Sequence, residues 1–386
     1  MSRNLLTIVV VAGLLAVAGC GGGSESPPST ALQAGPHPVA GNFKPDDREL
    51  SDCKSGDQAC LEQAFGNISY DDGPKTAMRL VAEKMNTDVT VQADCHRIVH
   101  MVGSAALARY DGNVPRAFAE GSATCWSGYY HGILERSFYG ATTIKEVARR
   151  ARRVCDDQDI RRTNFLAYQC VHGLGHGLMI NMGYDLPTAL EVCDGLATAW
   201  DQTSCTGGVF MENISSSYGV KSKWLRDNNL VYPCNVVKER HKLYCYLMVT
   251  SRILQANGYD WKAAARTCSR VEKNWVATCF QSYGRDASGF TRQNPPKIMG
   301  LCRIAGKGQS DCIYGASRDL TSNDANGTRA AQLCNVAPAG DRGRCFAGIG
   351  TIIAGFSASA ADHRAACGSL TQTFLRACLR GAGDNE

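Results

Sequence analysis

The sequence of 386 residues lacks most of the motifs that identify an enzyme class directly. It contains no phosphate-binding Walker loop, no Gly-x-Ser-x-Gly nucleophile elbow and no His-Glu-x-x-His zinc motif. The absence of Cys-x-x-Cys excludes a thioredoxin-type redox pair and covalently attached c-type haem. With 41 Lys and Arg against 36 Asp and Glu, the chain has no strong basic excess, and we expect no nucleic-acid partner.

Long apolar runs are also missing, except at the N-terminus. Residues 1–19 combine Arg3 with an apolar run from Leu5 to Ala18, which predicts a secretory signal peptide rather than a membrane span of about 18 residues or more. The residues AVAGC that end at Cys20 resemble the lipobox of bacterial lipoproteins. This resemblance implies cleavage before Cys20 and its acylation, hence a lipid anchor in the cell membrane or outer membrane, facing the periplasm or the exterior. A plain signal peptide with a chance cysteine is the alternative.

The rest of the chain divides by composition. Residues 20–50 are expected to hold the lipidated cysteine and a flexible tether, because GGGSESPPST and five of the twelve prolines lie between positions 21 and 45. Residues 51–230 are interpreted as histidine-rich N-terminal repeats, and residues 231–386 as C-terminal repeats with paired cysteines.

Cysteine is unusually frequent, with 19 copies. Without Cys20 the number is even, which in an oxidising compartment predicts nine disulfides. From Cys155 onward the cysteines form pairs 10 to 15 residues apart, and the first members of the pairs recur after 32 to 41 residues. The expected bonds are Cys155–Cys170, Cys193–Cys205, Cys234–Cys245, Cys268–Cys279, Cys302–Cys312, Cys334–Cys345 and Cys367–Cys378. For the irregular front of the chain, Cys53–Cys60 and Cys95–Cys125 are the simplest assignment, although spacing alone does not fix connectivity.

A period of about 34 residues is typical of helical-hairpin repeats. Helix-forming stretches such as WKAAARTC precede the first cysteine of a unit, and small apolar residues follow the second. A glycine stands three residues after the second-type cysteine in six units, which indicates close helix contacts, at Gly128, Gly173, Gly208, Gly315, Gly348 and Gly381. The predicted fold is all-α, a right-handed α-solenoid of hairpins, each with an internal disulfide. From residue 75 to the end, spacing and period resemble disulfide-braced, secreted tetratricopeptide-like repeat proteins, without that family's aromatic and alanine signature.

Five of the eight histidines lie between positions 96 and 176. His96 with His100, and His172 with His176, are four residues apart and share a helix face, as two imidazoles on one metal ion require. His131 and His176 occupy the same position in successive units, and equivalent positions of a solenoid line one surface. The predicted metal ligands are His96, His100, His131, Glu135, His172, His176 and Glu212.

The chemistry of such a site depends on its donors. If all thiols form disulfides, nitrogen and oxygen ligands remain, which suit Zn, Fe, Cu or Mn, and axially ligated haem stays possible. Glu135 and Glu212 are candidate general bases for a metal-activated water, so the chain is either an enzyme or a metal-binding protein.

A second interpretation is a non-catalytic scaffold that binds a protein or envelope partner, in which the histidines form only a buried polar network. Glycines between His172 and His176 favour a ligand instead, because small residues make room. The Arg285-Asp286 and Arg318-Asp319 pairs are interpreted as ion pairs within repeats, or else as partner contacts.

Overall fold

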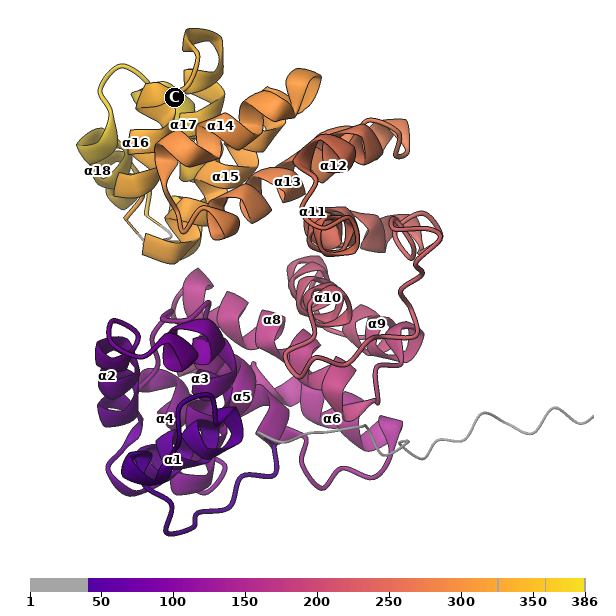
Figure 1. Ribbon diagram of the computed structural model, residues 1–386. Helices are drawn as coiled ribbons and strands as arrows, with labels where there is room; N and C mark the ends of the chain where they lie inside the picture. Colours follow the sequence, from indigo (N-terminus) through magenta and orange to yellow (C-terminus); the bar gives the residue numbers. More distant parts are fainter. Residues whose placement is uncertain (1–40, 325, 358, 385–386) are drawn as a thin grey trace, which may run out of the picture.

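The computed structural model describes residues 41–324, 326–357 and 359–384, which form α-helices, short 3-10 helices and loops with no β-strand among them (Figure 1). The all-α prediction is therefore confirmed. The predicted signal peptide, Cys20 and the first part of the tether lie outside the described residues. None of the helices in the described part of the chain is both long enough and apolar enough to cross a membrane.

One series of helices runs through the molecule, each packed against the next in chain order, and we call these the central helices. They are α1 (Gln58–Asp71), α3 (Val89–Arg109), α5 (Gly128–Ser137), α8 (Asn164–Asn181), α10 (Ala199–Ile214), α11 (Glu239–Ala256), α13 (Val276–Phe290), α15 (Gln309–Asp324), α17 (Ala339–Phe356) and α19 (Leu375–Ala382).

Shorter helices flank this series. They are α2 (Pro74–Lys84), α4 (Val114–Ala119), α6 (Ile144–Val154), α7 (Gln158–Arg161), α9 (Leu186–Asp194), α12 (Trp261–Cys268), α14 (Pro295–Ile304), α16 (Thr328–Val336) and α18 (Ala360–Leu370), with 3-10 turns η1 (Leu50–Asp52), η2 (Lys273–Trp275) and η3 (Gly306–Gly308). Polar side chains start many of them: Thr143 caps α6, Asp260 caps α12 and Asn294 caps α14 by accepting a backbone N–H of the first turn.

Disulfides tie the flanking helices to the central ones. The structure joins the cysteines in the nine pairs that the spacing predicts. Cys302–Cys312, for example, joins α14 to α15 across the short connection that contains η3. A bond that closes about 11 residues stabilises a fold by roughly 3 kcal/mol through the entropy of the unfolded chain.

The unit of Cys234 departs from the expected hairpin. Residues 215–238 form turns and bends instead of a first helix. Asp227, Asn228, Asn229 and Pro233 explain the difference, since Asp and Asn favour turns and Pro interrupts a helix. We call residues 215–238 the site loop, because it supplies side chains to the histidine cluster described below.

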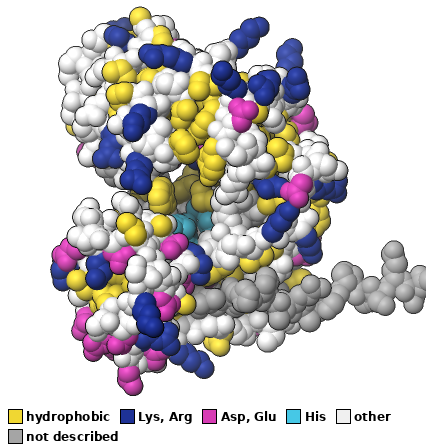
Figure 2. Space-filling view, in the orientation of Figure 1, with side chains coloured by type: hydrophobic (Ala, Val, Ile, Leu, Met, Phe, Trp, Pro, Cys, Tyr) yellow, Lys and Arg dark blue, Asp and Glu magenta, His cyan; other side chains and the backbone are white. Residues whose placement is uncertain are grey.

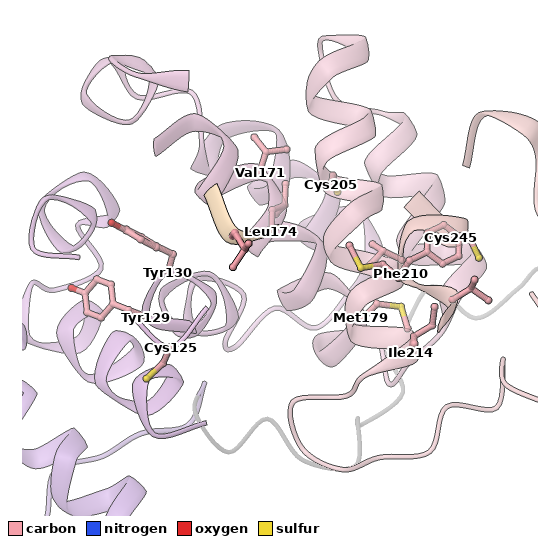
Figure 3. Close-up of a cluster of buried hydrophobic side chains, with 14 of the residues drawn as sticks. Cys125, Tyr129, Tyr130, Val171, Leu174, Met179, Cys205, Phe210, Ile214 and Cys245 are labelled. Atoms are coloured by element: carbon pink, nitrogen blue, oxygen red, sulfur yellow. The ribbon is translucent and has the colours of Figure 1, made fainter. Parts of the chain in front are cut away.

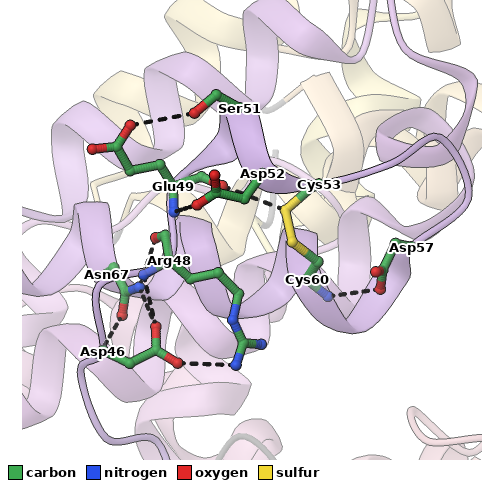
Figure 4. The surroundings of a disulfide bond; sticks show 9 residues. All are labelled: Asp46, Arg48, Glu49, Ser51, Asp52, Cys53, Asp57, Cys60 and Asn67. Atoms are coloured by element: carbon green, nitrogen blue, oxygen red, sulfur yellow. Dashed lines mark hydrogen bonds and ion pairs between the residues drawn. A yellow bond between two sulfur atoms is a disulfide. The ribbon is translucent and has the colours of Figure 1, made fainter.

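The end of the predicted tether belongs to the folded part. Phe43 is buried against Met101 and Ala105, and Arg136 Nη1 donates to the Phe43 carbonyl oxygen at 2.8 Å. Asn67 Nδ2 donates to Asp46 Oδ1 and to the Arg48 carbonyl oxygen, both at 2.8 Å, beside the Cys53–Cys60 bond (Figure 4). Residues 43–48 are therefore held by the fold, whereas composition predicts a flexible segment up to residue 50.

The C-terminal part of the central series returns to contact its N-terminal part. Helix α17 contacts α8, where the rings of Phe165 and Phe356 lie 5.2 Å apart and Asn164 Nδ2 donates to the Ala354 carbonyl oxygen at 3.5 Å. A hollow therefore lies between the N-terminal and C-terminal halves, as Figure 2 shows. We call this hollow the chamber.

Glycines let neighbouring central helices touch through their backbones. A Cβ atom on Gly284 would lie 1.9 Å from the Cys312 carbonyl oxygen, and one on Gly315 would lie 2.1 Å from that of Gln281. Both distances are far below van der Waals contact, so α13 and α15 can pack this closely only without those side chains.

We predict that Gly284→Ala destabilises the protein by about 2 kcal/mol or more, because backbone atoms rather than a mobile side chain must move. Gly289→Ala on the same helix is the matched control. Its Cβ would meet nothing within 4 Å, so alanine should be neutral or stabilising. Urea midpoints measure both effects, and equal midpoints for the two variants would contradict the packing described here.

Candidate metal centre

Three central helices bring five histidines together in the N-terminal half. Helix α3 carries His96 and His100, α5 carries His131, and α8 carries His172 and His176. The ring of His131 lies in the middle, with ring-centre distances of 5.4 Å to His96, 5.3 Å to His100, 5.8 Å to His172 and 4.1 Å to His176. The structure thus unites all five residues that the sequence singles out, and we call them the histidine cluster.

Within the cluster, two sets of three nitrogen atoms lie close enough to suit a metal ion. The first set is His96, His100 and His131, and the second is His131, His172 and His176. In each set the ligand atoms lie within 4.8 Å of one another. His96 Nε2 and His100 Nε2 are 3.1 Å apart, near the roughly 3.3 Å that separates two nitrogens on one tetrahedral zinc ion with bonds of about 2.0–2.1 Å.

In three imidazoles a hydrogen bond fixes Nδ1, the ring nitrogen on the side away from the centre of the cluster. His96 Nδ1 donates to the Cys125 carbonyl oxygen at 2.7 Å, His100 Nδ1 bonds Glu135 Oε1 at 2.5 Å, and His176 Nδ1 bonds Glu212 Oε2 at 2.9 Å. Metal-binding histidines in proteins are usually held in this way by a carboxylate or a carbonyl group. The arrangement leaves Nε2 of each ring for the cluster interior.

Side chains of the site loop donate hydrogen bonds to the carboxylates of Glu135 and Glu212. Tyr218 donates to Glu135 Oε2 at 2.5 Å, and the Ser217 hydroxyl donates to Glu212 Oε2 at 2.6 Å. Tyr184 adds a bond to Glu212 Oε1 at 2.7 Å. Neither glutamate lines the chamber, so both lie behind the imidazoles rather than beside a substrate space.

The two carboxylates differ in charge behaviour. Burial raises the pKa of Glu135 to about 8, against the lowering effect of the Tyr218 bond. Burial acts in the same direction on Glu212, but hydrogen bonds from His176, Ser217 and Tyr184 lower its pKa to about 2. Glu212 is therefore ionised at neutral pH, whereas Glu135 can share a proton with His100 across their hydrogen bond.

The histidines themselves are held neutral. Burial lowers the pKa of His96 and of His100 to about 3, and it lowers the pKa of His131 and His172 well below the usual value. Neutral imidazole is the form that binds a metal ion, so the cluster does not need to lose ring charge before binding one.

Several buried nitrogens of the cluster have no partner. Neither Nδ1 nor Nε2 of His131 accepts or donates a hydrogen bond, and His176 Nε2 is also unpartnered. Buried polar atoms are normally satisfied, and each orphan costs about 1–3 kcal/mol. A purely structural polar network would leave these atoms unexplained, whereas metal ions would give them partners.

A packed apolar core supports the cluster. Tyr129 and Tyr130 on α5, Leu174 on α8 and Phe210 on α10 are buried in the apolar core formed by these helices (Figure 3). Tyr129 donates to the Ala117 carbonyl oxygen at 2.7 Å, so its ring does not contribute to the histidine network through its hydroxyl group. The helices that present the imidazoles are therefore fixed by apolar packing on their other faces.

The chamber reaches the cluster from the other side. His131 and His172 line one cavity of about 220 Å³, and His96 and His176 line an adjoining cavity of about 450 Å³. In Figure 2 the histidines are visible at the bottom of the hollow between the two halves. A ligand in the chamber would therefore meet the open side of any ion held by the cluster.

Sequence reasoning missed Tyr184, Ser217 and Tyr218. Tyr218 lies 83 positions from Glu135, in a loop without regular pattern, so no spacing rule relates them. His241 and His363 lie outside the cluster, where each contacts an aspartate, Asp194 and Asp384 respectively.

Comparisons of the chain with protein-family models, with curated proteins and with solved structures found no match. The function must therefore be inferred from the site itself.

We predict that the metal-free protein loses stability as the pH falls from about 6.5, the ordinary histidine pKa. The unfolded chain binds protons on His96, His100, His131 and His172 that the folded cluster rejects, so acid favours unfolding. Glu135 opposes the trend, because its raised pKa favours the folded state at low pH, but it is one group against four.

Urea unfolding of chelator-treated protein between about pH 7 and pH 5 measures the slope against pH. His131→Gln should make this slope shallower, since one of the rejected protons is lost. Stability that stays constant or rises with acidification would contradict the neutral, buried state of the cluster.

Proposed function

We propose that the chain is an extracytoplasmic metal-binding protein whose histidine cluster holds two transition-metal ions that share His131. The observation that carries this proposal is the central, buried imidazole of His131, both of whose nitrogens lack a partner. The many disulfides support a location in an oxidising compartment.

The argument for two ions starts from His131. One ion satisfies only one nitrogen of a ring, and the other nitrogen would remain buried without a partner. Two ions, one in each three-histidine set, satisfy both nitrogens through a bridging imidazolate. The two sets overlap at this residue, as such a bridge requires.

Charge supports the same arrangement. Each set has one buried carboxylate behind it, Glu135 behind His100 and Glu212 behind His176. Cations in a buried site need negative charge nearby, and these two glutamates with the imidazolate supply three charges against four from two divalent ions. In this proposal Glu135 and Glu212 position the imidazoles and balance charge instead of binding the metal directly.

Three nitrogen donors leave each ion an open coordination position. Such sites in metalloenzymes hold a water molecule and polarise it for hydrolytic or redox chemistry. Zn, Fe, Cu and Mn all accept this donor set. The chamber supplies the space that a substrate would need beside these positions.

The remaining parts of the proposal concern the membrane anchor and the arrangement of the repeats. We propose that Cys20 carries the lipid anchor, and that the hairpins form a right-handed solenoid with a repeat of about 34 residues. The chain order of contacts along the central helices supports the solenoid, because each unit packs mainly on its neighbours.

The decisive experiment is elemental analysis of untagged protein after incubation with Zn, Cu, Fe or Mn and removal of excess metal. We predict close to two ions per chain for at least one of these metals. His131→Ala should reduce the content to one ion or fewer, because it removes a ligand from both sets.

His241→Ala is the control, since it removes a buried histidine outside the cluster and should leave the metal content unchanged. Melting curves of both variants establish that they are folded. Wild-type protein that binds no metal, and whose melting temperature no added metal changes, would contradict the proposal and favour the scaffold interpretation.

A separate prediction concerns the anchor. Cys20→Ala should release the mature protein from the membrane fraction to the soluble extracytoplasmic fraction, because an unmodified chain has no acyl groups to bury in the bilayer. Immunoblots of fractionated cells, with wild type as the control, measure the distribution. Retention of the variant in the membrane fraction would rule out the lipid anchor.

A further inference from the structure

The chamber has a second polar wall opposite the histidine cluster. This wall comes from the C-terminal half, where α13 contributes Arg285 and Asp286 and α15 contributes Arg318 and Asp319. These are the Arg-Asp pairs that recur along the sequence. In the structure they behave differently from each other.

Arg285 is fully engaged. Its Nη2 donates to Asp286 Oδ1 at 2.8 Å and to the Ser251 hydroxyl at 2.5 Å, as expected of an ion pair within a repeat. Asp286 also accepts hydrogen bonds from Thr250 and Ser251. The charges of Arg285 and Asp286 therefore neutralise each other.

Arg318 is not engaged in this way. It makes no ion pair with Asp319 or with any other carboxylate among the described residues, and its buried Nε has no hydrogen-bond partner. Asp319 instead accepts from Asn323 Nδ2 at 3.3 Å. The guanidinium carbon lies 5.8 Å from the centre of the Tyr314 ring, and this cation–π contact supplies no hydrogen-bond acceptor.

An unpaired guanidinium in a partly buried cavity destabilises the protein unless an anion accepts its hydrogen bonds and balances its charge. Arg presents a planar fork of N–H donors, which suits the two oxygens of a carboxylate or phosphate group. The lining of the same cavity predicts the rest of the ligand. Tyr168, Tyr244, Leu247 and Ile352 supply aromatic and aliphatic surface.

We infer that the chamber binds a small organic anion whose carboxylate or phosphate head contacts Arg318 and whose apolar body lies among Tyr168, Tyr244 and Leu247. The two adjoining cavities, about 220 and about 450 Å³, accommodate a small molecule rather than a polymer. The anion would span the space between the two halves.

The far end of such a ligand faces the histidine cluster. Tyr168 borders the cluster, since its ring stacks on His172 at 5.1 Å and its hydroxyl lies 3.3 Å from His172 Nδ1. The anion's contact with the metal ions rests on the proposed function, whereas its contact with Arg318 does not. The two parts can therefore fail separately.

Calorimetric titration of untagged, chelator-treated protein tests the Arg318 contact. The probes are benzoate and phenyl phosphate, which share an aromatic body and differ in the anionic head, and benzamide, which is the neutral analogue of benzoate. We expect at least one anion to bind with a Kd at millimolar or lower concentration and benzamide to bind at least tenfold more weakly. The anion that binds tighter identifies the head group.

Variants locate the binding. Arg318→Gln should weaken the preferred anion at least tenfold, and Arg318→Lys should retain part of the affinity because it keeps the charge. Arg303→Gln is the matched control, an exposed arginine on α14 that does not line the chamber, and it should bind as wild type does. Melting curves establish that each variant is folded.

Three results would overturn the inference: no binding of either anion, equal affinity for benzamide and benzoate, or unchanged affinity in Arg318→Gln. Equal losses in the Gln and Lys variants would also count against it, because they would indicate packing rather than charge. Repeating the titration after metal loading separates the two proposals. If the protein takes up no metal but still binds an anion through Arg318, this inference is supported and only the metal-binding proposal is contradicted.

Discussion

Backbone contact between central helices is the constraint on which the rest of the structure depends. A Cβ on Gly132 would lie 1.8 Å from the His100 carbonyl oxygen, and one on Gly208 would lie 1.9 Å from that of His172. Helices that touch at glycine bring their axes closer than larger side chains allow. Because α3 and α5 are this close, and α5 in turn packs against α8, imidazoles on three separate helices reach one another.

The close packing also buries the polar side chains of the site, and this burial lowers the stability of the fold. Four of the five histidines and both glutamates are buried where apolar side chains would otherwise form the core, and buried polar groups destabilise a fold unless they are paired. Nine disulfides act in the opposite direction, because they limit the unfolded chain. The disulfides and the polar centre are therefore physically related, because the stability gained from the disulfides offsets the cost of burying the polar groups.

Much of this arrangement follows from periodicity. The paired cysteines repeat with the units, so their partners could be predicted, and His131 and His176 fall together because they share a repeat position. Periodicity says nothing about the site loop, where the expected helix is missing and Tyr218 contacts Glu135 from a distant segment. It also cannot show that Glu135 contacts the outer nitrogen of His100, since spacing places a residue on a face without giving the direction of its side chain.

The chamber depends on a contact that no repeat pattern contains. Its histidine wall and its arginine wall belong to opposite halves, and they face each other because α17 returns to α8 through Phe356 and Phe165. An open array would leave Arg318 in solvent, where water would satisfy its donors at little cost. Return of the array onto itself removes much of that water, and this makes the missing partner of Arg318 energetically significant. The same closure that covers the histidine cluster thus leaves the buried Nε of Arg318 without an acceptor opposite it, and this is the basis of the anion site that we infer.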